Sequence, residues 1–227
     1  MPTTTETNNA AKKKRPRMTR ERVLAGALAL ADEIGVAELT IRRLADALDS
    51  KPMTIYHHVP SKDEILDGIV DLVFAEIELP DRELPWKAAV RARCISARTV
   101  LAKHPWAVPL MESRRSPGPA TLGHHDAMIA CLRTELSISM TGHAYAVLDA
   151  FLYGFAIQEA SLPAPGDEMT EVAEDLINDE LAEHFPALHD FAVGQALQPG
   201  YDFGNEFEFG LDLILDALEA QAAAERT

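Results

Sequence analysis

Side chains that can bind nucleic acid are concentrated in one stretch, KPMTIYHH, at residues 51–58. Its lysine offers a positive charge to phosphate, its hydroxyl and imidazole groups can hydrogen-bond to base edges, and its methionine offers an apolar contact to the thymine methyl group. A packed surface would use the same residue types. The stretch therefore indicates DNA binding only if it is exposed on an element that fits a DNA groove.

The residues around this stretch predict two short helices joined by a tight turn. Thr40 is a suitable N-cap for a helix whose apolar residues recur at helical spacing as far as Leu48. The Asp-Ser dipeptide that follows favours a turn, and Pro52 is tolerated in the first turn of a second helix that must end before Pro60. This is the pattern of a helix-turn-helix, whose second helix is thin enough to enter the major groove.

Longer helices are predicted on both sides of this pair. One is capped by Thr19 and ends at Gly35, and another starts at a capping box formed by Ser61 and Glu64 and runs to residues 79–80. Helix N-termini attract phosphate, so polar residues at the starts of the second and fourth helices are also placed to hold the DNA backbone. The candidate DNA contacts are Thr40, Arg42, Lys51, Pro52, Met53, Thr54, Tyr56, His57, His58 and Lys62.

The distribution of charge supports this interpretation. The whole chain has a net charge of −15, which alone argues against nucleic acid. Residues 1–62, however, contain 11 basic and 7 acidic residues, whereas the rest of the chain contains 10 basic and 29 acidic ones. A basic N-terminal module on an acidic body suits a DNA-binding head. The basic run at residues 12–17 belongs to a polar arm predicted to be disordered, which raises nonspecific affinity for DNA or reaches the minor groove.

The rest of the chain predicts helices and no strands. Helical periodicity returns at residues 86–103, 120–136, 142–162, 168–184 and 203–224. The predicted fold class is therefore all-α, with an N-terminal three-helix helix-turn-helix domain and a larger helical domain. In the last helix, Phe207 and Phe209 are two positions apart and so lie on different faces, which predicts that one face contacts a partner.

Two segments resemble the tetracycline-repressor (TetR) family. Residues 39–71, LTIRRLADALDSKPMTIYHHVPSKDEILDGIVD, resemble its DNA-binding module in the LT-x-R-x-LA opening, the T-x-Y-x-H-V of the recognition helix and the lysine at the start of the fourth helix. Residues 207–220, FEFGLDLILDALEA, resemble the last helix of the tetracycline repressors themselves. The likeness is dense at both ends of the chain and weaker in the middle.

The resemblance implies an organisation and a set of partners. Residues 1–17 would be the disordered basic arm, residues 18–64 the DNA-binding domain, and residues 65–227 a domain for ligand binding and dimerisation. The chain would form a homodimer through a four-helix bundle made by the helices that begin at Gly142 and Phe203 in each subunit. It would bind double-stranded operator DNA through the candidate contacts given above.

The inducer implied by the resemblance is an unknown small molecule. Tetracycline repressors bind their drug as a metal chelate, but this sequence has Glu78, Met111 and Gln158 where the contacting histidines and carboxylate would be needed. Tetracycline is therefore not the expected inducer, and no cofactor or metal is expected. The candidate pocket residues, each of which is also typical of plain core, are Trp86, Trp106, Met111, Phe151, Phe155 and Gln158.

Other residue clusters give no convincing chemistry. The adjacent His124 and His125 point about 100° apart on a helix, and Glu180 with His184 forms an ordinary side-chain pair one turn apart. No nucleophile paired with a base and no glycine-rich phosphate loop is found, so the chain is predicted not to be an enzyme. No signal peptide or membrane-spanning run is found either, which predicts a cytoplasmic location.

The sequence thus predicts a transcription regulator, most simply a repressor that leaves a palindromic operator when a small molecule binds. Two alternatives stay open at this point. The chain could regulate transcription without a ligand or as an activator, because the direction of regulation depends on where the operator lies. It could also be a helical small-molecule-binding protein or enzyme with a vestigial DNA-binding head.

Overall fold

The computed structural model describes residues 17–114, 116–162, 179–198 and 200–225. All regular elements in these residues are helical, as predicted. In chain order they are α1 (Arg20–Ile34), α2 (Ile41–Ala47), α3 (Pro52–His58), α4 (Lys62–Glu76), α5 (Trp86–Lys103), α6 (Ala107–Ser113), α7 (Pro119–Leu132), α8 (Ile138–Ala160), α10 (Asp179–His184), α11 (Pro186–Phe191), the π-helix η1 (Ala192–Ala196) and α12 (Asn205–Glu225).

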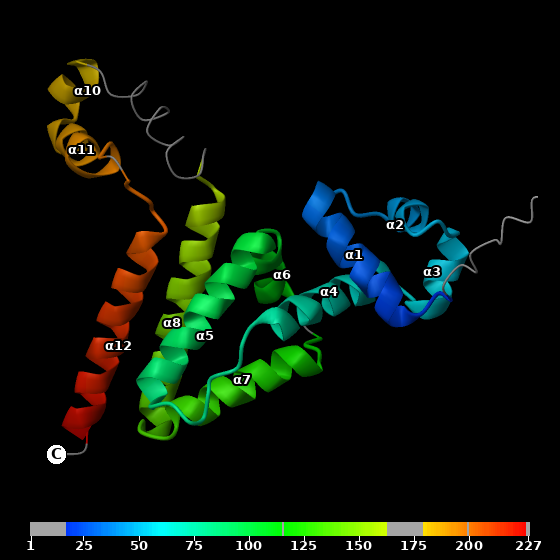
Figure 1. Cartoon of the computed structure of the whole chain (residues 1–227), viewed down its shortest axis with the longest axis horizontal. Helices are drawn as coiled ribbons and strands as arrows, with labels where there is room; N and C mark the ends of the chain where they lie inside the picture. The colour runs from blue at the N-terminus through cyan, green and yellow to red at the C-terminus, as the bar shows by residue number, and fades with distance from the viewer. Residues whose placement is uncertain (1–16, 115, 163–178, 199, 226–227) are drawn as a thin grey trace, which may run out of the picture.

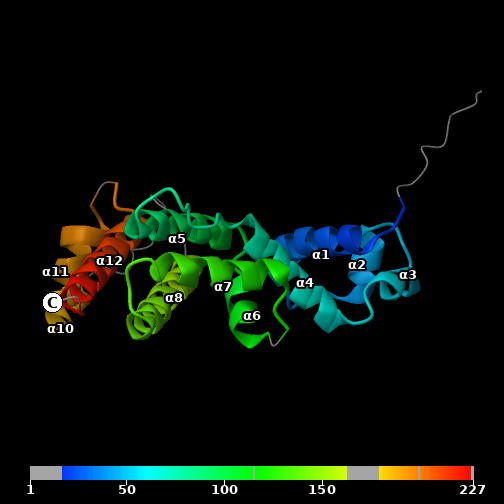
Figure 2. The same cartoon turned by 90° about the horizontal axis from the view of Figure 1, so that it is seen from below.

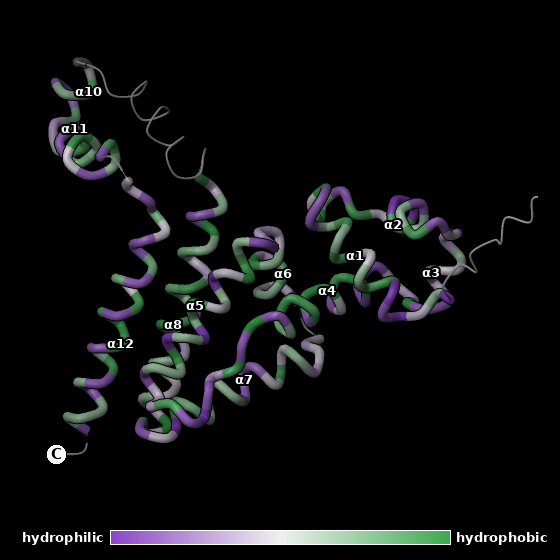
Figure 3. Tube along the Cα trace, in the orientation of Figure 1, coloured by the Kyte–Doolittle hydropathy of each residue, from purple (hydrophilic) through white to green (hydrophobic). Residues whose placement is uncertain are grey.

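The molecule is elongated, with a head at one end and a body at the other (Figures 1 and 2). The head consists of α1, α2, α3 and the first turns of α4. The body consists of the remaining helices, with α12 at the end farthest from α3 (Figure 1). Hydrophobic and hydrophilic residues alternate along α12 (Figure 3), as expected for a helix that packs one face against α8 and α5.

Side-chain caps explain where several helices begin. The hydroxyl oxygens of Thr19, Thr40 and Ser61 each accept a hydrogen bond from the backbone N–H three residues later, at 3.1–3.2 Å. Such caps satisfy amide groups that have no partner within the helix. The caps predicted from the sequence are confirmed, and so is the end of α1 at Gly35, whose φ of 77° suits glycine.

Helix α4 links two hydrophobic clusters. Its first half contributes Ile65 and Ile69 to the head cluster, and its second half contributes Val73 and Phe74 to the body cluster. A boundary drawn after residue 64 therefore falls within the first turn of a helix that both clusters share.

The head packs closely on this helix. A Cβ atom on Gly68 would lie 2.6 Å from Cδ2 of Leu24, so glycine is what allows α1 and α4 to approach each other. A larger residue at this position would push the two helices apart.

Several predicted helix ends differ from the structure. Helix α4 ends at Glu76 rather than at residues 79–80, because Ile77 adopts an extended backbone with ψ of 134°. The helix predicted over 120–136 ends at Leu132, and the next one begins at Ile138 rather than at residue 142. Ser137 explains this early start, because its hydroxyl caps the Met140 N–H at 3.1 Å.

Three short elements escaped prediction, namely α6, α11 and η1. They contain only seven, six and five residues, which is too few to show an apolar repeat. Of the helix predicted over 168–184, the part before residue 179 lies outside the described residues, and so does the predicted arm except for Arg17. No helix in the described part of the chain is both long enough and apolar enough to cross a membrane.

Candidate functional site

Helix α3 is anchored by one side and exposed on the other. Ile55 and the following Val59 are fully buried in the head cluster. Between and before these anchors, Met53 is 76% exposed and Tyr56 is 42% exposed. The polar and aromatic residues of α3 therefore face solvent, at the end of the molecule farthest from α12 (Figure 2).

The turn before α3 fixes this helix against α2. Asp49 adopts a left-handed backbone with φ of 48°, a conformation that aspartate tolerates better than most residues. The N–H of Ser50 then donates to the carbonyl oxygen of Ala45 at 2.8 Å, which closes the end of α2. The turn is consequently tight, and the direction of α3 is set by backbone hydrogen bonds.

The remaining predicted contacts lie at two helix starts that flank α3. Thr40 and Arg42 begin α2, Lys62 begins α4, and all three are exposed. The neighbouring Arg43 instead forms an ion pair within the head, in which its Nη1 lies 2.7 Å from Oε2 of Glu38. The structure thus brings all ten predicted DNA contacts together on the head, exposed or half-buried.

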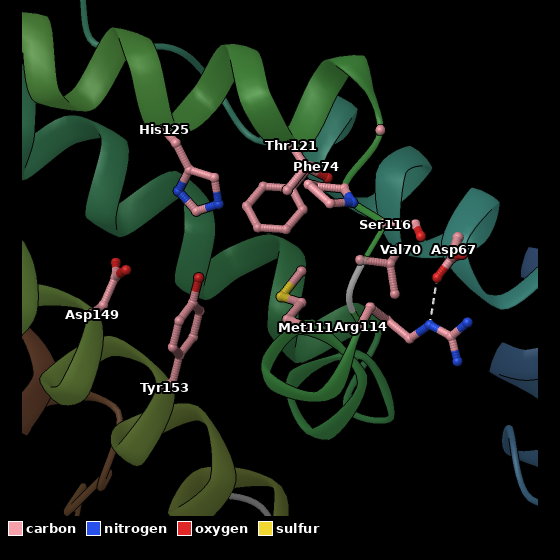
Figure 4. Close-up of a pocket in the computed structure, with 12 residues that line it drawn as sticks. Asp67, Val70, Phe74, Met111, Arg114, Ser116, Thr121, His125, Asp149 and Tyr153 are labelled. Atoms are coloured by element: carbon pink, nitrogen blue, oxygen red, sulfur yellow. Dashed lines mark hydrogen bonds and ion pairs between the residues drawn. The ribbon is translucent and has the colours of Figure 1, made fainter. Parts of the chain in front are cut away.

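The body contains a cavity of about 200 Å³ between α4, α6, α7 and α8 (Figure 4). Apolar side chains such as Phe74 and Met111 share its wall with ionisable and hydroxyl groups. The cavity is lined by Asp67, Val70, Phe74, Met111, Arg114, Ser116, Pro117, Gly118, Thr121, His125, Asp149 and Tyr153.

Hydrogen bonds attach two walls of the cavity to α4. Arg114, directly after α6, pairs through Nε with Asp67 and through Nη1 with Oδ1 of Asp63 at 3.1 Å. The N–H and hydroxyl of Thr121 on α7 both donate to Oδ1 of Asp71, at 2.8 and 2.9 Å. Displacement of α6 or α7 would therefore pull directly on α4, whose first turns belong to the head.

Burial shifts the pKa values of two titratable groups beside the cavity. Tyr145 hydrogen-bonds to Nδ1 of His125, and burial, together with the nearby Asp149 charge, raises the pKa of Tyr145. Burial lowers the pKa of His124, and the neighbouring Arg93 charge lowers it further. The tyrosine is therefore a neutral phenol and His124 a neutral imidazole at pH 7.

Comparison with known proteins decides the family. Residues 79–222 match the model of the tetracyclin repressor-like C-terminal domain, and residues 23–69 match that of the bacterial regulatory proteins of the tetR family. The chain belongs to the TetR family. It is accordingly an all-helical DNA-binding transcription regulator.

Similar proteins of known name cover nearly the whole of this TetR-family chain. An HTH-type transcriptional regulator of Saccharopolyspora erythraea is 28% identical, over 93% of this chain and 89% of the relative. The HTH-type transcriptional repressor DrrR1 of Streptomyces coeruleorubidus is 27% identical, over 93% of this chain and 81% of the relative. The structure of ActR from Streptomyces coelicolor in complex with actinorhodin is 26% identical, with a TM-score of 0.74 over 91% of this chain and 99% of that one.

Of the six predicted pocket residues of this TetR-family regulator, Met111 alone lines the cavity. Trp86 is buried beside a separate hollow near α7, and Gln158 is exposed. Trp106 turns toward the head, where its Nε1–H donates to Oδ1 of Asp32 at 2.7 Å.

Phe151 and Phe155 belong to an aromatic cluster between α8 and α12. Phe151 stacks on Phe207 at 5.4 Å between ring centroids, and Phe155 stacks on Phe203 at 4.7 Å. These four rings fill the body core and leave the cavity wall to other residues.

The sequence reasoning missed most of the polar cavity lining. One signal was available in Asp149, the only acidic residue between positions 138 and 158. Within the described residues, no group of three or more His, Cys, Asp or Glu side chains is arranged to hold a metal ion. The side chain of Glu180 lies outside the described part of the chain.

Proposed function

We propose that this TetR-family regulator is a cytoplasmic homodimeric repressor that a small organic molecule releases from a palindromic operator. The observation that carries the proposal is the attachment of the cavity walls to α4 through Arg114 and Thr121. Because α4 also supplies Ile65 to the head cluster, a ligand that favours a displaced α6 or α7 would change the position of the head.

The ten predicted DNA contacts on the head divide by chemistry into two proposed roles. Arg42, Lys51 and Lys62 carry charges for phosphate oxygens, and the Thr40 side chain caps α2 where its N-terminus meets the DNA backbone. The side chains of α3 that point outward read base edges in the major groove, namely Pro52, Met53, Thr54, Tyr56, His57 and His58. Two heads of a dimer would then contact half-sites about 34–36 Å apart, or a multiple of that distance.

Exposed apolar side chains mark the proposed dimer face. Val147 and Ile157 on α8 are 42% and 49% exposed, and Phe209 and Leu213 on α12 are 56–65% exposed. Residues this apolar are unusual on a monomer surface when they gather on two adjacent helices. We propose that α8 and α12 form a four-helix bundle with their copies in the second subunit.

Replacement of Phe209 by aspartate is expected to shift the protein from dimer to monomer. A charge would be buried without a partner in each half of the bundle, which weakens association by at least about a hundredfold. Analytical ultracentrifugation over a range of protein concentrations measures this effect. Leu122→Asp on the outer surface of α7 is the matched control, and an unchanged dimerisation constant in Phe209→Asp would contradict the proposed face.

The cavity favours an aromatic ligand that can form hydrogen bonds. Phe74 and Tyr153 offer ring faces, whereas Arg114, His125 and Asp149 offer charge and hydrogen bonds. The similar protein ActR has been solved in complex with actinorhodin, which supports ligand binding by this chain. At about 200 Å³ the cavity is smaller than the ~300–1,000 Å³ of most drug-sized sites, so such a ligand must select an enlarged form of the body.

The proposal is tested by selecting an operator from random DNA with the full-length protein and then titrating the complex with actinorhodin as the first probe. We expect a palindromic operator, release of wild-type protein by the probe, and no release of a Met111→Trp variant that fills the cavity but still binds DNA. Failure to select any specific DNA sequence would contradict the DNA-binding role. Equal release of both proteins would contradict the assignment of the cavity.

A further inference from the structure

Asp32 connects the head to the body through hydrogen bonds to residues outside α4. It lies in the last turn of α1, and its Oδ1 accepts two hydrogen bonds from the body, each 2.7 Å long. The donors are Nδ1–H of His104, directly after α5, and Nε1–H of Trp106, directly before α6. The short turn between α5 and α6 is therefore fastened to the end of the first head helix.

A third helix end meets the same histidine. Nε2 of His104 lies 3.4 Å from Oε2 of Glu76, in the last turn of α4. His104 is only 6% exposed, so its ring is enclosed between the two carboxylates. We call this group the junction, and it consists of Asp32, Glu76, His104 and Trp106.

The positions of the two acidic residues indicate that the junction is more than a chance surface contact. Both Asp32 and Glu76 lie in C-terminal turns, where the helix dipole disfavours negative charge, and neither helix has a basic residue in its last turn. For Asp32, the hydrogen-bond donors of the turn between α5 and α6 supply the compensation. Without the body, this carboxylate would destabilise its own helix.

Trp106 reinforces the junction by packing. Its ring contacts the hydrophobic clusters of both the head and the body, so the residue lies between them. Removal of the indole N–H alone would leave this packing in place and delete the hydrogen bond to Asp32.

We propose that the junction sets the angle of the head on the body and thereby determines which half-site spacing the dimer accepts. This inference rests on the proposed function. A single shared helix, α4, would leave the head free to twist about the helix axis, whereas a second connection to one side of that axis prevents the twist. Asp32, His104 and Trp106 would then be positioning residues for DNA recognition that do not touch DNA.

The test measures selectivity for spacing rather than affinity alone. Insertion or deletion of one base pair between half-sites moves them by about 3.4 Å and rotates them by about 35°. For the wild type we expect each change to weaken binding by at least about tenfold, since one head loses its base contacts. For Asp32→Ala we expect an affinity for the parent operator within about threefold of that of the wild type. On the operators with altered spacing, we expect this variant to lose less than about threefold of its own affinity for the parent operator.

Two further variants make the result specific. Trp106→Phe deletes one donor and keeps a smaller aromatic ring at this position, and we expect it to relax spacing selectivity in the same direction. Glu33→Ala removes the same charge from the same turn of α1, but Glu33 is exposed and, within the described residues, forms no hydrogen bond or ion pair with the body, so wild-type selectivity is expected. Thermal unfolding of each variant checks that the head stays folded.

The outcomes separate this inference from the proposed function. If the wild type selects no operator, the proposed function fails. If it selects one but tolerates every spacing, or if Asp32→Ala and Trp106→Phe keep the wild-type selectivity, the junction proposal is overturned while DNA binding stands. A uniform loss of affinity at all spacings, accompanied by earlier unfolding, also overturns it, because the junction would then contribute only stability.

Discussion

Replacement of Tyr56 by alanine is expected to lower affinity for the operator by at least about thirtyfold and to leave the free energy of unfolding unchanged. Tyr56 is 42% exposed on α3, next to the buried Ile55 that anchors the helix. A base contact contributes about 1–3 kcal/mol, and a dimer loses two of them at once. Fluorescence anisotropy with the selected operator, at one fixed salt concentration, measures the loss.

Two control variants show which part of the Tyr56 side chain contributes to DNA binding and whether the effect is specific to α3. Tyr56→Phe keeps the ring and removes the hydroxyl, so its affinity separates hydrogen bonding from stacking or apolar contact. Leu122→Ala removes an exposed side chain from α7, outside the set of predicted DNA contacts, and should bind DNA like the wild type. If Tyr56→Ala binds the operator within about threefold of the wild type, α3 does not read bases through this residue.

Replacement of Phe207 by alanine is expected to lower the free energy of unfolding by about 3–5 kcal/mol, because it opens a cavity in the body core. Phe207 is fully buried, and its ring stacks on that of Phe151. The centroid of the Phe207 ring lies 5.1 Å from that of the Phe155 ring and 5.2 Å from the Arg98 guanidinium. Urea denaturation followed by circular dichroism measures the change.

Phe209 provides the matched control for this prediction, since it is the same residue type two positions along the same helix. It is 65% exposed, so Phe209→Ala opens no core cavity. Its loss of stability should be smaller and should decrease as protein concentration rises, because mass action restores the dimer. Equal losses in the two variants at high protein concentration would show that Phe207 is not the core residue described above.

The head was predictable from sequence because its determinants are local. Thr40 and Ser61 cap helices within three residues of themselves, and Ile55 reveals the buried side of α3 by its spacing alone. The exposure of the candidate DNA contacts follows directly from that spacing. The structure added the left-handed backbone of Asp49 in the predicted turn and the intramolecular pair of Arg43 with Glu38.

The cavity was not predictable because its residues come from four separate elements. Asp67, Met111 and His125 are each unremarkable in their own helix, and they meet Asp149 only through packing. Helix periodicity marks a residue as inward-facing, but it does not distinguish a core position from a cavity wall. This is why the sequence pattern favours Phe151 and the other large apolar residues as pocket candidates and does not reveal the ionisable lining.

The sharing of α4 between the two hydrophobic clusters has a consequence for protein engineering. A chimeric regulator that joins this head to a foreign body just before Lys62 would lose Ile65 and Ile69. The head cluster would then lack the two buried side chains that α4 contributes to it. A cut just after α4 would instead carry Val73 and Phe74 into a body that was not shaped for them. Modular exchange of heads therefore requires α4 to be a hybrid helix, with its first half taken from the donor of the head and its second half from the donor of the body.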